Sequence, residues 1–75
     1  MGKMMDRFRL RSVGHADRDL IKVMHVLDGA IENIGTACDY PEDGIPPTGG
    51  REVLVVMLEA METVIRARRM IGELK

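Results

Sequence analysis

Residues 50–74, "GREVLVVMLEAMETVIRARRMIGEL", decide the fold, because apolar residues recur in them every three or four positions. Apolar residues at this spacing fall on one face of an α-helix. The valine-rich start "VLVVML" would by itself also suit a buried strand, but the helical spacing continues to the end of the segment. The segment therefore predicts a helix near 50–74. Its first apolar row comprises Val53, Met57, Ala60, Val64, Ala67, Ile71 and Leu74, and a second row beside it comprises Leu54, Leu58, Met61 and Ile65.

The two rows together form an apolar arc roughly 200° wide, whereas one packing partner needs only about 100°. The remaining face carries charged residues, and Glu62 and Arg66 are of opposite charge and four positions apart, which favours a solvated helix face. One short neighbouring helix does not cover so wide an arc, so the pattern indicates a second copy of the chain. Arg68 falls inside the arc, and we expect it at the rim of that interface, against an acid of the partner chain.

Residues 15–38, "HADRDLIKVMHVLDGAIENIGTAC", predict another helix, over about 16–38. The opposite side of this helix is polar and is expected to face solvent. Gly29 lies on that side, and it is either tolerated there or marks the close approach of another backbone. The apolar seam is Leu20, Met24, Leu27, Ile31, Ile34 and Cys38, widened on one side by Ala16, Val23, Ala30 and Ala37.

The segment between the two predicted helices, residues 39–49, is "DYPEDGIPPTG", and its prolines and glycines exclude a helix or a central strand. It is either a stiff spacer or a partner-binding loop that presents Tyr40, Asp43 and Ile45. The predicted fold class is all-α: an antiparallel two-helix hairpin domain over 15–75. Two such hairpins are expected to pair into a homodimer resembling a four-helix bundle.

Residues 1–14 are predicted to form a basic N-terminal arm, either flexible or a short strand. The stretch "RFRLR" (7–11) alternates arginine with apolar residues, which is the period of a half-buried strand. Basic residues outnumber acidic ones in this arm, whereas residues 15–48 carry an acidic excess. Such an arm suits contact with its own body, with a second copy or with an anionic partner.

A short alternating strand followed by two helices in a homodimer resembles the ribbon–helix–helix family of DNA-binding proteins. The resemblance implies that Arg7, Arg9 and Arg11 enter the major groove while Phe8 and Leu10 join the core. It also implies that "TGGRE" (48–52) clamps a phosphate at the start of the second helix. Arginine pairs well with guanine edges. The long first helix, the proline-rich loop and the acidic body depart from the family's pattern.

Several classes of protein are disfavoured by the composition. Cys38 is the single cysteine, so no intrachain disulfide framework exists, which suits a reducing cytoplasm. The start has no apolar stretch typical of a secretory signal, and "VLVVML" is too short to cross a membrane. No cofactor motif and no metal-ligand set is present, and neither Cys38 nor the pair Glu59 and Glu62 forms a convincing catalytic group. We therefore expect no enzymatic activity, no metal and no cofactor.

The wide apolar helix faces, the adaptable methionines and the charged arm suit helix-in-groove recognition of another protein. The sequence therefore predicts a small non-enzymatic regulator, for instance an antagonist that masks a transcription factor or an enzyme. Self-association and partner binding are expected to compete for one face of the second helix. A DNA-binding regulator is the alternative, and an anionic ligand at Gly49–Gly50 is a third. The predicted partner-binding residues are Arg7, Phe8, Arg9, Leu10, Arg11, Leu54, Leu58, Met61, Ile65 and Arg68.

Overall fold

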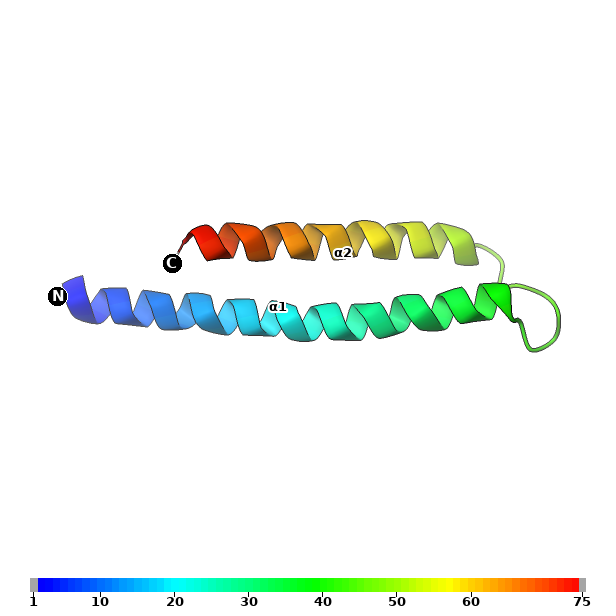
Figure 1. The fold of residues 1–75 in the computed structure, drawn as a ribbon, viewed down its shortest axis with the longest axis horizontal. Coiled ribbons are helices and arrows are strands. Elements are labelled where there is room, and N and C mark those ends of the chain that lie inside the picture. Colours follow the sequence, from blue (N-terminus) through cyan, green and yellow to red (C-terminus); the bar gives the residue numbers. More distant parts are fainter. Residues whose placement is uncertain (1, 75) are drawn as a thin grey trace.

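A computed structural model of the chain describes the backbone of residues 2–74 and the side chains of residues 11–74. Helix α1 (Gly2–Asp39) and helix α2 (Gly50–Glu73) lie side by side and antiparallel (Figure 1). The first turns of α1 extend beyond the end of α2, and the loop joins the helices at the opposite end. The all-α hairpin predicted from the sequence is confirmed.

The N-terminal segment differs from its prediction. Instead of a flexible arm or a short strand, the described residues 2–14 form the first turns of α1, and no strand occurs anywhere in residues 2–74. Two physical reasons account for the difference. The alternating pattern spans only five residues and a lone strand has no neighbour to pair with, whereas lysine, methionine, arginine and leucine all favour helix.

The helices meet along a contact seam, defined here by the half-buried side chains of each helix that face the other. The predicted seam of the first helix is confirmed, since all six of its members are half-buried. On α2 the seam takes members from both predicted apolar rows, so each row contributes some exposed residues as well. The seam comprises Val13, Asp17, Leu20, Ile21, Met24, Leu27, Ile31, Ile34 and Cys38 of α1 with Leu54, Met57, Met61, Val64, Arg68 and Ile71 of α2.

The loop is held by local hydrogen bonds. The backbone N–H of Gly44 donates to the carbonyl of Pro41 (3.2 Å), and the N–H of Ile45 donates to Oδ1 of Asp43 (3.1 Å). Gly49 caps α2 with a φ of 76°, a left-handed conformation that glycine adopts without strain. Gly50, the first residue of α2, is the one buried residue among residues 11–74.

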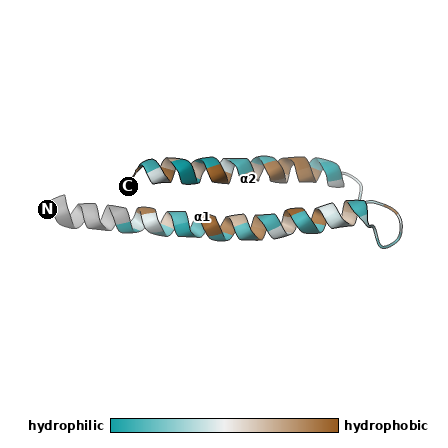
Figure 2. Ribbon diagram, in the orientation of Figure 1, coloured by the Kyte–Doolittle hydropathy of each residue, from teal (hydrophilic) through white to brown (hydrophobic). Residues whose placement is uncertain are grey.

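No large hydrophobic side chain among residues 11–74 is fully buried. The Cα radius of gyration is 17.9 Å, whereas a compact chain of this length would have one of about 11 Å. Hydrophobic residues concentrate in the half of α2 nearest the loop (Figure 2). None of the described helices is long and apolar enough to cross a membrane. The hairpin is thus a thin, extended body whose apolar residues lie largely at its surface.

Candidate functional site

An ion pair crosses the contact seam near the end of α2. Nε of Arg68 donates to Oδ1 of Asp17 at 2.9 Å, and Nη2 lies 3.5 Å from Oδ2 of the same carboxylate. Nη1 of Arg68 also lies 3.8 Å from the sulfur of Met24. We expected an acid of the partner chain opposite Arg68, but an acid of its own chain occupies that place.

The ion pair further favours the charged form of Arg68. The hydrogen bond to Asp17 raises the pKa of Arg68 above its ordinary value, and the nearby negative charge of Asp17 acts in the same direction. A raised pKa means that this contribution to stability is complete below the ordinary pKa of arginine and is lost only above it. The charge of Arg68 therefore stays constant through the neutral range.

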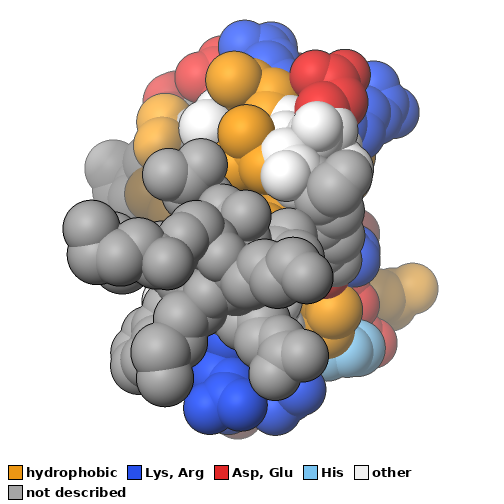
Figure 3. Space-filling model, turned by 90° about the vertical axis from the view of Figure 1, so that its left-hand side faces the viewer, with side chains coloured by type: hydrophobic (Ala, Val, Ile, Leu, Met, Phe, Trp, Pro, Cys, Tyr) orange, Lys and Arg blue, Asp and Glu red, His pale blue; other side chains and the backbone are white. Residues whose placement is uncertain are grey.

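The four residues of α2 predicted to bind a partner divide into two pairs. Leu54 and Met61 are half-buried in the contact seam, whereas Leu58 is 51% exposed and Ile65 is 36% exposed. Leu58 and Ile65 stand beside the seam on one side of α2, and we call them the Leu58 face. Figure 3 shows the end of the molecule that contains the last turns of α2. Hydrophobic side chains are exposed on this end, among charged side chains.

A shallow groove adjoins the Leu58 face. Ile65 lines it together with Met24, Arg68 and Arg69. A neighbouring depression brings Met24, Met61 and Arg68 together with Ile21, His25 and Asp28 of α1. Arg68 thus belongs to the contact seam and also borders the Leu58 face, and the exposed Arg69 gives the rim of this face a positive charge.

The remaining predicted partner-binding residues belong to the first turns of α1. Arg11 is exposed. The side chains of Arg7, Phe8, Arg9 and Leu10 lie outside the described part of the structure, so their contribution to partner binding stays a prediction.

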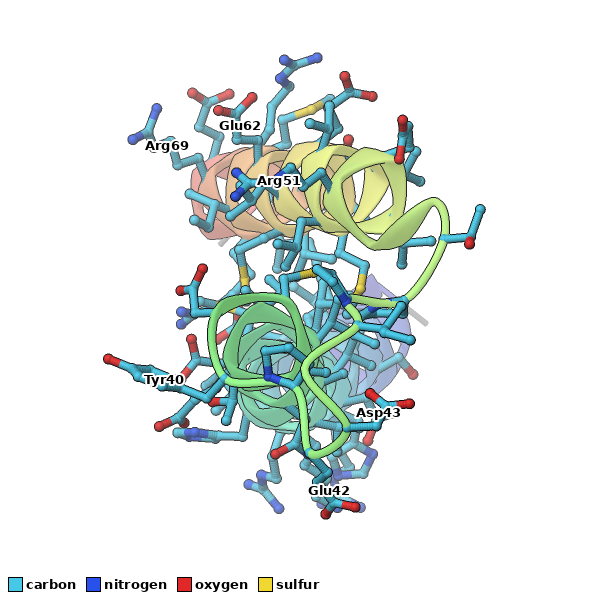
Figure 4. The ribbon with its side chains drawn as sticks, turned by 90° about the vertical axis from the view of Figure 1, so that its right-hand side faces the viewer. Tyr40, Glu42, Asp43, Arg51, Glu62 and Arg69 are labelled. Atoms are coloured by element: carbon cyan, nitrogen blue, oxygen red, sulfur yellow. The ribbon has the colours of Figure 1, made fainter. Side chains whose placement is uncertain are left out.

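The loop and the adjoining turns of α1 enclose an open depression lined partly by Tyr40, Asp43 and Ile45. The side chains of Tyr40, Glu42 and Asp43 point outward in different directions rather than toward one another (Figure 4). They therefore do not form a convergent site, and the arrangement favours the spacer interpretation of the loop.

Cys38 packs against the start of α2. A Cβ built on Gly50 would lie 2.7 Å from Sγ of Cys38 and 3.0 Å from Cγ of Pro47, so only glycine fits there without movement. Among the residues with described side chains, no group of three or more His, Cys, Asp or Glu is placed to hold a metal ion. The candidate catalytic carboxylates Glu59 and Glu62 are both exposed.

Sequence reasoning missed Asp17 as the partner of Arg68. The signal was present, because Asp17 precedes Leu20 and Met24 at the same three- and four-residue spacing and so occupies a seam position. A charged residue at a seam position on each of two facing helices indicates a pair across the seam.

Comparison with known proteins adds no relative. The sequence matches no protein-family model, and neither a curated protein nor a solved structure matches it significantly.

Proposed function

We propose that this chain is a small non-enzymatic regulator that acts as a homodimer of hairpins and binds another protein. The observation that carries the proposal is the amount of apolar surface on an otherwise well-formed hairpin. Leu58, Val56 and Met70 are each more than half exposed, and no large hydrophobic side chain among residues 11–74 is buried. Exposed apolar surface of this extent is typical of interaction surfaces.

The Leu58 face is the proposed partner-binding surface. It offers two aliphatic side chains one heptad apart, Leu58 and Ile65, with the flexible side chains of Met24 and Met61 nearby. An amphipathic helix presents apolar residues at this spacing, and methionine adapts to the shape of different partners. Arg68 and Arg69 border the groove, so an acidic flank on the partner's helix would complement it.

The basic first turns of α1 are the second proposed contact. Arg7, Arg9 and Arg11 give this segment its positive charge. Such charge speeds the encounter with an acidic partner more than it tightens the complex. A partner such as a transcription factor or an enzyme would be masked where the hairpin lies on it.

Affinity capture from the native cell tests the proposal when it is run with matched variants. We expect the wild-type chain to capture a specific protein, and we expect Leu58→Glu to lose it. Arg66→Ala, an exposed change on the polar face of the same helix, should retain it.

A DNA mobility shift at two salt concentrations, run beside the capture, tests the rival function. Specific, salt-sensitive DNA binding that Arg9→Ala abolishes, with no protein captured, would overturn the proposal in favour of a DNA-binding regulator.

A further inference from the structure

Helix α2 carries a second heptad stripe in addition to its contact seam. The stripe alternates steps of three and four residues over the whole helix, which is the spacing of a coiled-coil interface. Thr63 is its only polar member, and its hydroxyl donates to the carbonyl of Glu59 at 3.0 Å, so this polar group has a partner within the helix. The outer stripe of α2 comprises Val53, Val56, Ala60, Thr63, Ala67, Met70 and Leu74, all exposed except the half-buried Ala67.

Helix α1 carries a stripe of the same spacing on the same side of the hairpin, with two exposed polar members, Asp19 and Asn33. Val23, Val26 and Ala30 line one groove with Ala60 and Val64 of α2, which places both outer stripes on one face. Val23 is 46% exposed and Val26 is 75% exposed. The outer stripe of α1 comprises Ala16, Asp19, Val23, Val26, Ala30, Asn33 and Ala37. A helix that packs against one neighbour needs a single seam, so two seams on each helix indicate two neighbours for each helix.

The surface area of the chain fits one further neighbour of similar size. The hairpin exposes 6396 Å², whereas a compact monomer of 8.4 kDa would expose about 4,600 Å². A standard protein–protein interface removes about 800 Å² from each partner. The excess exposed by this hairpin is therefore more than a stable dimer needs.

We propose that a second copy of this chain covers the outer stripes, with α2 packed antiparallel on the partner's α2. This inference rests on the homodimer of the proposed function and names its face and register. A two-fold axis at Thr63 places Val53 opposite the partner's Leu74 and Val56 opposite the partner's Met70. Ala60 then lies opposite the partner's Ala67. The small residues stand near the axis, where the helices come closest, and the larger ones fill the ends.

The same axis brings α1 onto the partner's α1. Asp17 pairs with Arg68, and Val23 and Val64 line one groove, so Val23 lies near the level of Thr63 along the hairpin. The axis therefore sets Val23 against the partner's Val23. The first turns of α1, which extend beyond the end of α2 (Figure 1), then lie beside the last turns of the partner's α1. In this register the partner's α1 covers the first turns of α1, which have no neighbouring helix in the lone hairpin.

The proposed dimer leaves the Leu58 face open. Ile65 lines the groove with Met24, Arg68 and Arg69, which shares no residue with the groove of the outer stripes. Self-association and partner binding thus use opposite sides of α2. The dimer binds its partner without first dissociating, in contrast to the competition expected from the sequence.

Disulfide cross-linking tests this register. In a Cys38→Ser background, Thr63→Cys and Val23→Cys each place a thiol on the proposed axis, where it meets its own copy. Glu62→Cys is the control, since Glu62 does not belong to the outer stripe and its exposed side chain points away from α1 (Figure 4). A disulfide forms readily only where the Cα atoms are about 4.4–6.8 Å apart. With oxidised glutathione at micromolar protein, we expect covalent dimers from Thr63→Cys and Val23→Cys and far fewer from Glu62→Cys.

Sedimentation of the unmodified chain separates the ways in which this inference could fail. A monomer at micromolar concentration would overturn the dimer and its register together, while Leu58-dependent capture of a partner would still stand. A dimer that cross-links through Glu62→Cys, and not through Thr63→Cys, would overturn the face and leave the dimer. A dimer with the expected cross-links that nevertheless captures no protein would support the register and count against the regulatory function.

Discussion

The contact between Cys38 and Gly50 fixes how closely the two helices approach beside the loop. Because a Cβ at position 50 would lie 2.7 Å from Sγ of Cys38, the backbone of α2 rests directly on the thiol. The start of α2 packs this closely on α1 only because Gly50 has no side chain.

Gly50→Ala is expected to lower the free energy of unfolding by about 1–3 kcal/mol, the usual cost of overpacking. Denaturant unfolding followed by circular dichroism measures the loss. Cys38→Ala removes the sulfur that the new methyl group meets, so the double variant should be more stable than the sum of the single changes allows. Strictly additive effects would mean that Cys38 and Gly50 are not in contact.

Asp17→Ala is expected to lower the Tm, because Arg68 then keeps a charge in the contact seam without its carboxylate. The double variant Asp17→Ala with Arg68→Leu makes the seam apolar throughout, and we expect its Tm to lie above that of Asp17→Ala. Thermal melts of the three proteins give the order. A Tm for the double variant below that of Asp17→Ala would show that Arg68 contributes through contacts other than this pair.

At the scale of the elements, each helix has a face that packs on the other helix and a polar face that is solvated. Met61 and Val64 are half-buried in the contact seam, whereas His25 is exposed and lies beside the seam, at the depression that it lines with Met61. The two faces are expected to respond differently to a charge.

Met61→Asp or Val64→Asp is expected to cost about 2 kcal/mol or more, because each places an unpaired carboxylate in the seam. In a hairpin with so little buried surface, this loss should be visible as reduced helicity at room temperature. His25→Ala should leave the melting curve unchanged. If circular dichroism showed the reverse, the facing of both helices would be wrong.

Gly29→Ala is expected to stabilise the protein by about 1 kcal/mol, since alanine favours a helix interior over glycine. No atom lies within 4 Å of a Cβ built there, so the added methyl group meets open space. Gly49→Ala is the matched control, and it should destabilise because Gly49 has a φ of 76°. Denaturant unfolding compares the two. Loss of stability in Gly29→Ala would indicate another chain packed close to Gly29.

The two helices were predictable from the sequence because their apolar periodicity extends over many turns. The first helix was predicted too short, because the alternation of the five residues "RFRLR" (7–11) has the period of a strand. Whether a strand forms there depends on a neighbouring strand, which periodicity does not reveal. The spacing marks Asp17 and Arg68 as seam residues, but pairing them also needs the relative shift of the helices along their axes, which the loop length leaves free.

For the whole molecule, the proposed dimer makes stability depend on concentration. Anything that binds only the folded hairpin stabilises it by mass action, and the stabilisation by a second copy grows with the logarithm of its concentration. We expect the Tm to fall by a few degrees on each tenfold dilution from the micromolar range. A Tm that stays constant over two such dilutions would contradict the proposed dimer.

The single loop at one end of the hairpin also sets an order of assembly. Cys38 and Gly50 are separated by little more than the loop, whereas Asp17 and Arg68 are 51 positions apart. The entropy lost in closing a chain segment grows with the length of the segment. Contacts beside the loop are therefore expected to form first, and the remaining contacts between the helices to form progressively toward the termini. Substitutions at Gly50 should therefore slow folding, whereas substitutions at Asp17 should leave the folding rate unchanged and speed unfolding.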